Sequence, residues 1–328
     1  MFAVIAQSID PMASDPMGSK SGPASVSRRA LPGAALGRIA FGIDKLPPTL
    51  VMLLAIVSVQ LGSALATVLF SSIGPAGTAF ASALFSAAAL TAMSRLRLVG
   101  GLLRRHALLI LVFGVVEAAM GLPFFLALER IPLGIASTIT FLGPLGLAVA
   151  TSRRLAHFLW IGIAAVGVAL LAPEIGTAVD TGGLDPLGLF YAAIAGLAWA
   201  AFVPLSKKVG AVFPGNAGLA LAMWVSAVLL LPAAAFEHSI FAAGFGDIAG
   251  ALGVSLLGVV LPLVLEFRAL QRMSARTYGI LVTLEPAVGA LVGVLCLGQP
   301  AGTRMVIAVA CVMLAALGVT LSDRRESD

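Results

Sequence analysis

The sequence predicts an all-α polytopic membrane protein with ten transmembrane helices, arranged as two five-helix repeats of inverted topology. Three observations predict this class. Of the 328 residues, 60% are hydrophobic and 11% are charged, whereas a soluble domain carries roughly 25% charged residues. Apolar runs of about 17–23 residues, the length that crosses a bilayer, recur along the chain. The chain also matches itself weakly at a shift of 142 residues.

Ten apolar segments are the predicted spans. They cover residues 49–70, 75–94, 107–128, 132–151, 157–172, 187–206, 217–236, 247–267, 277–297 and 303–321. Turn residues separate several neighbours, as at Gly74-Pro75 and Pro214-Gly215-Asn216. Because most connections are only a few residues long, neighbouring spans are expected to run antiparallel.

Basic residues predict the orientation of these spans. With a cytoplasmic N-terminus, eighteen of the 20 Lys and Arg residues fall on the cytoplasmic side, and only Arg130 and Arg304 face outward. This asymmetry predicts a multi-pass membrane protein with both termini in the cytoplasm. It also explains the net charge of +5 without nucleic acid, because the basic residues form no patch with interleaved aromatics.

The internal match divides the chain into two halves. The stretch FLALERI (125–131) aligns with FRALQRM (267–273), and LGPLGLA (142–148) aligns with LEPAVGA (284–290). Five spans per half is an odd number, so the second half begins on the opposite side of the membrane, as in alternating-access transporters. The predicted units are a flexible N-terminal tail (1–46), the first repeat (47–173), an external linker (174–186), the second repeat (187–321) and a C-terminal tail (322–328).

Prolines and deep carboxylates mark the candidate site. Pro144 and Pro286 occupy equivalent positions of the two repeats and predict paired helix interruptions, where inverted-repeat transporters bind their substrates. Glu285 directly precedes Pro286, and Glu117 lies near the centre of the third span. An ionised carboxylate at this depth is costly. Each one therefore either binds a proton or a substrate ammonium, or stays protonated and serves packing alone.

Other polar and aromatic side chains fall at similar depth. They either line the same cavity or bond to neighbouring helices, and the aromatic ones could instead anchor at the interface: Gln60 and Ser63 of the first span, Thr138 and Thr140 of the fourth, Trp199 and Tyr278. Glu266 lies near Arg268 and Arg272 at the end of the eighth span, where an interfacial ion pair is expected.

Two stretches also carry a family resemblance. RIPLGIASTITFLGPLGLAVATSRR (130–154) and RTYGILVTLEPAVGALVGVLCLGQ (276–299) resemble the EamA-type drug/metabolite transporters, and are most similar to the threonine/homoserine exporters of bacterial inner membranes. The resemblance implies the duplicated five-helix fold, export of a small substrate and a plausible proton antiport. The chain departs from the exporters at Thr140, where they carry a glutamate. Its first-half carboxylate is Glu117, one helix earlier.

Enzyme motifs are absent from the sequence. It has no P-loop, no His-Glu-x-x-His, no Gly-x-Ser-x-Gly and no dinucleotide fingerprint. No histidine lies at mid-span to act as a base for Ser63 or Ser137. We therefore predict no enzyme, no cofactor and no metal site. The predicted function is a secondary transporter exporting small amino acids such as threonine or homoserine, with a different polar metabolite or a drug as the alternative. Its predicted partners are that substrate, protons and the lipid bilayer.

Overall fold

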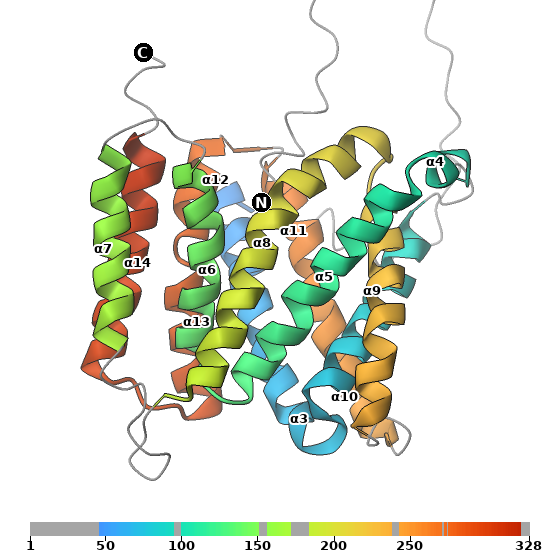
Figure 1. Ribbon diagram of the computed structural model, residues 1–328, viewed down its shortest axis with the longest axis horizontal. Helices are drawn as coiled ribbons and strands as arrows, with labels where there is room; N and C mark the ends of the chain where they lie inside the picture. Colours follow the sequence, from blue (N-terminus) through green and yellow to red (C-terminus); the bar gives the residue numbers. More distant parts are fainter. Residues whose placement is uncertain are drawn as a thin grey trace, which may run out of the picture.

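The computed structural model describes residues 46–94, 100–150, 156–171, 184–237, 243–270, 272–273 and 275–322. Its elements are helices (Figure 1), in the order α3 (Pro48–Met93), α4 (Gly100–Arg105), α5 (Ala107–Leu128), α6 (Leu133–Ala150), α7 (Ala156–Leu171), α8 (Pro186–Val212), α9 (Ala217–Phe236), α10 (Phe245–Ser255), the π-helix η6 (Leu256–Val260), α11 (Leu261–Leu270), α12 (Ala275–Val282), α13 (Glu285–Leu297) and α14 (Thr303–Ser322). The predicted tails and most of the predicted linker lie outside the described residues.

The all-helical membrane class is confirmed. In the described part of the chain, six helical segments are long and apolar enough to cross a membrane, and shorter apolar helices accompany them. Each predicted span falls on a helix or on part of one. The first two share α3, the eighth combines α10, η6 and α11, and the ninth combines α12 and α13.

The long helix α3 is broken at Gly74. Forty-six residues of helix would extend about 69 Å at 1.5 Å per residue, twice the roughly 30 Å of a bilayer core. Gly74 has φ 70° and ψ 167°, a conformation that only glycine adopts readily, and Pro75 follows it. The Glu237 carboxylate at the end of α9 accepts hydrogen bonds from the backbone N–H groups of Ala76 (3.1 Å) and Gly77 (3.2 Å). It thereby caps the helix that starts after the break.

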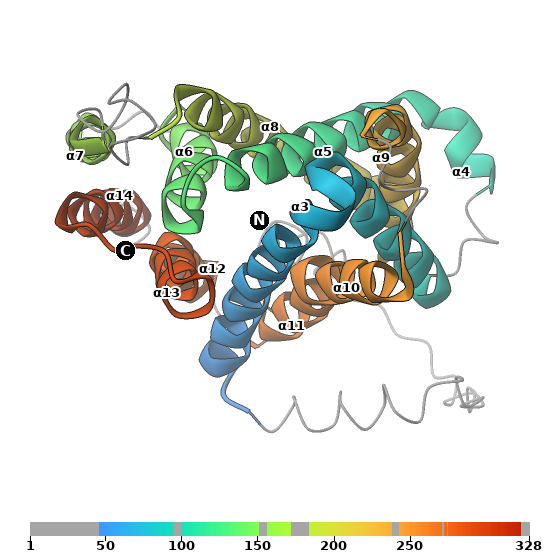
Figure 2. The same cartoon turned by 90° about the horizontal axis from the view of Figure 1, so that it is seen from below.

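The helices stand side by side and alternate in direction (Figure 1). α10 lies below α11, whereas α12 lies above α13, so these successive segments run in opposite senses. Seen from below in Figure 2, α3 with α10 and α11 forms one side of the bundle and α5 with α8 forms the other. α7 and α14 pack together at one end, beside α6 and α13.

Helix α6 crosses α8 at very close range. A Cβ added to Gly143 would overlap the carbonyl oxygen of Gly196, so the two backbones touch at this point. α6 runs unbroken through Pro144, which corrects the predicted interruption there. A proline removes one backbone hydrogen bond, and packing against α8 holds the helix together despite that loss. In the second half the chain does break, because α12 ends at Val282 and α13 begins at Glu285, just before Pro286.

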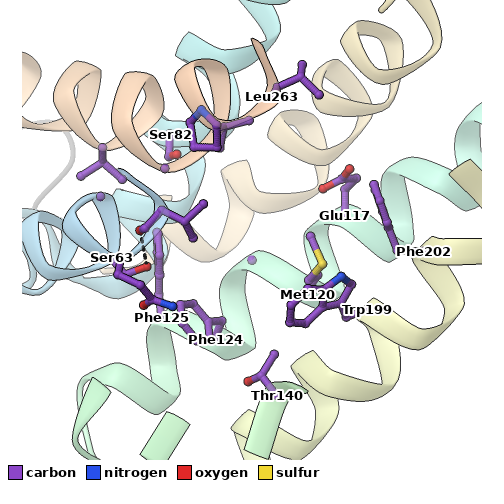
Figure 3. A pocket seen from close by; sticks show the side chains of 18 of the residues that line it. Ser63, Ser82, Glu117, Met120, Phe124, Phe125, Thr140, Trp199, Phe202 and Leu263 are labelled. Carbon is purple, nitrogen blue, oxygen red and sulfur yellow. Dashed lines mark hydrogen bonds between the residues drawn. The ribbon is translucent and has the colours of Figure 1, made fainter. Parts of the chain in front are cut away.

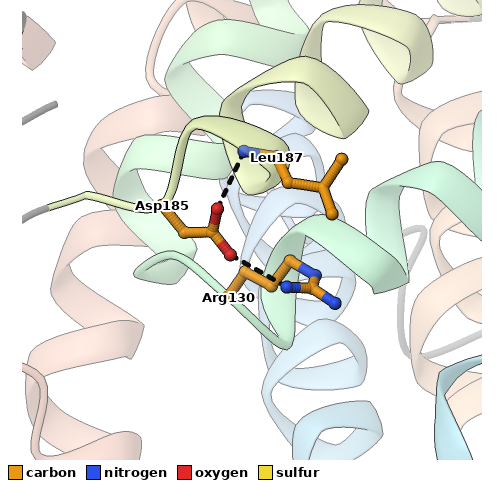
Figure 4. Close-up of polar contacts among 3 residues, drawn as sticks. All are labelled: Arg130, Asp185 and Leu187. Atoms are coloured by element: carbon orange, nitrogen blue, oxygen red, sulfur yellow. Dashed lines mark hydrogen bonds and ion pairs between the residues drawn. The ribbon is translucent and has the colours of Figure 1, made fainter. Parts of the chain in front are cut away.

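Asp185 connects the start of α8 to the turn between α5 and α6 (Figure 4). Its Oδ1 accepts from the backbone N–H of Leu187 at 2.8 Å and caps α8, and its Oδ2 pairs with Nη1 of Arg130 at 2.9 Å. The Arg130 guanidinium, followed by the bond from Leu187, holds the pKa of this carboxyl below its usual range. Both side chains are about one-third exposed, so the pair is screened by water.

The Gly143→Ala substitution should destabilise the protein, because the new methyl group has to displace backbone rather than a side chain. The expected loss is about 1–3 kcal/mol, as for other overpacked sites, measured as a lower Tm in detergent. Gly146→Ala is the matched control on the same helix, since nothing lies within 4 Å of the added Cβ. Equal stability of the two variants would contradict the close α6–α8 crossing.

The Asp185 contacts predict a pH-dependent stability difference. Asp185→Asn keeps a capping acceptor and loses the ion pair, whereas Asp185→Ala also loses the cap, at a further cost of about 1 kcal/mol. The ionised carboxyl contributes fully above the ordinary aspartate pKa of about 4. Because its folded pKa is lowered, that contribution is lost as the pH falls through the lowered value. The Tm advantage of wild type over Asp185→Asn should therefore vanish in acid, and a constant advantage would contradict the ion pair.

Candidate functional site

A cavity of about 280 Å³ lies in the middle of the bundle, between helices of both halves. Figure 3 shows part of its lining: Glu117, Met120 and Phe124 come from α5, Thr140 from α6, and Leu263 from α11. The volume is near the lower end of small-molecule sites, which hold roughly 300–1,000 Å³. The polar or titratable side chains that line it are Gln60, Ser63, Ser82, Glu117, Ser137, Thr140, Trp199, Ser226, Glu266, Tyr278 and Glu285.

Three carboxylates line this cavity and no described Lys, Arg or His does. Glu117 comes from α5, Glu266 from α11, and Glu285 from the first turn of α13. Glu117 is 6% exposed. Among the described residues, none of the three carboxyl groups has an ion-pair partner. A site with acidic groups and no internal cation is chemically suited to a proton or to an ammonium group.

Gln60 of α3 forms hydrogen bonds to two other helices that line the cavity. Its Nε2 donates to the backbone carbonyl of Glu285 at 3.3 Å, and its Oε1 accepts from the hydroxyl of Ser137 at 3.4 Å. The side chain of α3 therefore contacts both α6 and α13. Gly289 permits this approach, because a Cβ there would lie 2.9 Å from Ser137 Oγ and 3.2 Å from Gln60 Oε1.

The break before Glu285 leaves a backbone acceptor beside the cavity. Pro286 has no N–H to donate to the carbonyl of Val282 four residues earlier, and Val282 lines the cavity. Thr283 and Leu284 donate instead to carbonyls three residues back, at 3.2 and 3.0 Å, which tightens the turn. Glu285 lies in the first turn of α13, at the positive end of that helix's dipole.

The π-helix η6 was missed by sequence reasoning. Within it, the N–H of Leu261 donates to the carbonyl of Leu256 five residues earlier. The available signal was Pro262, which cannot donate to the carbonyl of Gly258 and so disturbs the α-helical pattern. π-bulges frequently occur at functional sites, and both Gly258 and Pro262 line the cavity.

Helix α3 packs directly on this π segment. A Cβ added to Gly62 would overlap the backbone of Gly258, and the hydroxyl of Ser58 donates to the carbonyl of Leu257 at 2.7 Å. The first-half helix thus supplies a hydrogen bond to a second-half carbonyl and leaves no room for a side chain between them.

Most residues singled out from the sequence meet in this cavity: Gln60, Ser63, Glu117, Thr140, Trp199, Tyr278 and Glu285. Trp199 also contacts Phe141 edge-on, with ring centroids 6.0 Å apart. Thr138 does not line it. Its hydroxyl donates to the carbonyl of Gly134 on its own helix at 2.6 Å, and the residue is 1% exposed. The prediction for Thr138 is therefore corrected, because α6 turns this side chain toward its own backbone.

Glu266 also lies elsewhere than predicted. Instead of forming an interfacial ion pair, it lines the cavity, and its Oε2 is shielded from solvent with no hydrogen-bond partner. Its neighbours Pro262 and Leu263 line the cavity too. A spacing of three and four residues places all three on one helical face, and this spacing was the signal that could have found Glu266.

The comparisons with known proteins agree on one family. The chain is 32% identical over 286 residues to the threonine/homoserine exporter RhtA of Salmonella typhimurium (strain LT2), covering 86% of this chain and 95% of the exporter. It is 32% identical over 281 residues to the exporter of the same name from Escherichia coli (strain K12), covering 85% and 93%. Residues 186–321 match the model of the EamA-like transporter family.

A protein of known crystal structure shares the fold. The TM-score is 0.54 at 20% sequence identity, over 86% of this chain and 99% of that protein. The relatives are transporters and not enzymes, as the missing catalytic motifs predict. On the strength of the match over most of its length, the chain belongs to the EamA-like transporter family.

Proposed function

We propose that this protein is a secondary transporter that exports small amino acids of the threonine/homoserine type across the cytoplasmic membrane. One observation carries the proposal: a central cavity holds three carboxylates and, among its described lining residues, no basic side chain. An amino acid offers the complementary ammonium group. The similarity to threonine/homoserine exporters over 86% of the chain supports this substrate class.

The cavity offers a partner to each part of such a substrate. The ammonium would pair with Glu285 or Glu117, and the side-chain hydroxyl would bond to Thr140. The substrate carboxylate would meet a neutral donor such as the hydroxyl of Ser82. Without a cationic partner this end is bound weakly, and weak binding suits a transporter that has to release its cargo.

Proton antiport follows from the same carboxylates. A proton and a substrate ammonium would compete for Glu285, because the carboxylate cannot hold both charges at once. Alternating occupancy would therefore couple export of substrate to entry of protons down their gradient. No ATP-binding motif is present in the sequence to supply another driving force.

The proposed architecture has ten spans in two inverted repeats, 47–173 and 187–321, with both termini in the cytoplasm. The break at Gly74 supports counting α3 twice. The packing is also reciprocal: α3 of the first half packs on α10, η6 and α11, and α8 of the second half packs on α5. The family match begins at residue 186, where α8 begins.

A different polar metabolite or a drug is the second candidate cargo. The observation that favours it is the apolar and aromatic wall of the cavity, formed by Met120, Phe124, Phe125, Trp199 and Phe202. Such a surface would bind a cargo with a larger apolar part than threonine has. Competition of candidate compounds with threonine efflux separates the two candidates.

An efflux assay with Glu285→Gln tests the function. The variant keeps shape and hydrogen bonding but cannot bind a cation by charge, so threonine efflux from overproducing cells should fall at least tenfold, about 1.4 kcal/mol or more. Glu129→Gln, the same exchange at an exposed loop carboxylate, is the matched control and should export normally. Wild-type efflux by Glu285→Gln, with unchanged pH dependence and equal amounts in the membrane, would contradict the proposal.

Cysteine labelling tests the orientation. Asp180→Cys, in a chain whose native Cys296 and Cys311 have been replaced, should react with an impermeant maleimide added to intact cells. The proposed linker then faces the outside, as the distribution of basic residues predicts. Labelling only after the cytoplasmic face is opened would contradict the topology.

A further inference from the structure

We propose that Glu266 is a proton-transfer residue that carries protons between Glu285 and the end of the bundle where α11 meets α12. The inference rests on the proposed transport function and adds a path for the proton that is separate from the substrate contacts. In this step a proton leaves the Glu285 carboxyl, bonds to an ionised Glu266 carboxylate and passes from there to water. No other bond changes.

The environment of Glu266 is that of a group that exchanges protons. Its Oε2 lies in the cavity region, shielded from solvent and without a hydrogen-bond partner. A carboxylate kept only for structure would be expected to have its buried oxygen bonded. The unbonded oxygen can accept a proton, and a proton on Glu285 can reach Glu266 through the cavity that both residues line.

The position of Glu266 along the bundle fits a relay. α11 ends at Leu270, four residues beyond Glu266, whereas Glu285 lies ten residues after α12 begins at Ala275. At about 1.5 Å per residue, Glu266 is about 6 Å below its helix end, whereas the 8 residues of α12, about 12 Å of helix, separate that end from the break before Glu285. Both side chains line one cavity. Glu266 therefore stands between Glu285 and this end.

Few other titratable groups face this pair. Glu117 faces the cavity from α5 and Tyr278 faces it from α12, while the described lining residues of α3, α6, α8, α9, α10 and η6 carry no acid or base. Ala269, three residues beyond Glu266 on α11, belongs to an apolar cluster with Met52 and Tyr278, which lie near the starts of α3 and α12. A proton that leaves Glu266 toward this end of the bundle would pass that cluster.

Only the second proposed repeat contains the carboxylate pair of the proton path. At the shift of 142 residues, Glu266 corresponds to Phe124 and Glu285 corresponds to Gly143. Phe124 lines the cavity but cannot hold a proton, and Gly143 lies against the α8 backbone with no room for a side chain. The first half therefore lacks an equivalent pair, and protons would leave along the second half alone.

Transport by purified protein in liposomes tests this assignment. Glu266→Gln should lower the ratio of pH-gradient-driven threonine accumulation to gradient-free threonine exchange at least about tenfold, because exchange needs no net proton movement. Glu285→Gln should lose both activities. A wild-type ratio of accumulation to exchange in Glu266→Gln would show that Glu266 is not a proton-transfer residue.

A measurement without substrate tests the proton-transfer role of Glu266 independently of the proposed substrate class. Wild type that exchanges neither threonine nor homoserine would refute the proposed substrates and leave the proton path open to measurement. Infrared difference spectra on a pH change, in protein with no substrate, should show carboxyl bands, one of which disappears in Glu266→Gln while the Glu285 band titrates at a different pH. An unchanged Glu285 band in Glu266→Gln would overturn the inference.

Discussion

Carboxylates at membrane depth have to be kept away from lipid. The helices meet this constraint by turning their carboxylates toward a common cavity. Glu117, Glu266 and Glu285 come from three separate helices and reach a single cavity. Lipid offers them neither water nor hydrogen bonds, so exposure on the outer surface would be costly. The bundle therefore has to hold its helices close around the cavity without filling it.

Backbone contact between helices provides that closeness. Gly62 lies against Gly258, Gly143 against Gly196, and Gly134 against Ala290. Small residues let helices approach in membranes, where hydrophobic burial adds little to association. All three contacts join the proposed halves: α3 with η6, α6 with α8, and α6 with α13. A pair of halves held at narrow crossings can rock about them while the cavity changes its access.

The sequence predicted the features that depend on local chemistry. Apolar length located the helices, Gly74-Pro75 located the break in α3, and the cost of a charge in lipid singled out Glu117 and Glu285. Features that depend on packing between helices could not be predicted from the sequence. Pro144 does not break α6 because α8 supports that helix. Thr138 turns to its own backbone, and Glu266 was assigned by nearby arginines rather than by the helical face it shares with Pro262. To predict the π-helix η6, one would have to know that α3 packs against the backbone of Gly258.

The most direct test of the account is proton release on substrate binding. Purified wild-type protein in weakly buffered detergent solution is mixed with threonine, and both binding heat and released protons are recorded. If an ammonium replaces a proton on the cavity carboxylates, about one proton should be released per bound molecule over the pH range in which they are protonated. Threonine binding that releases no proton at any pH would contradict the account.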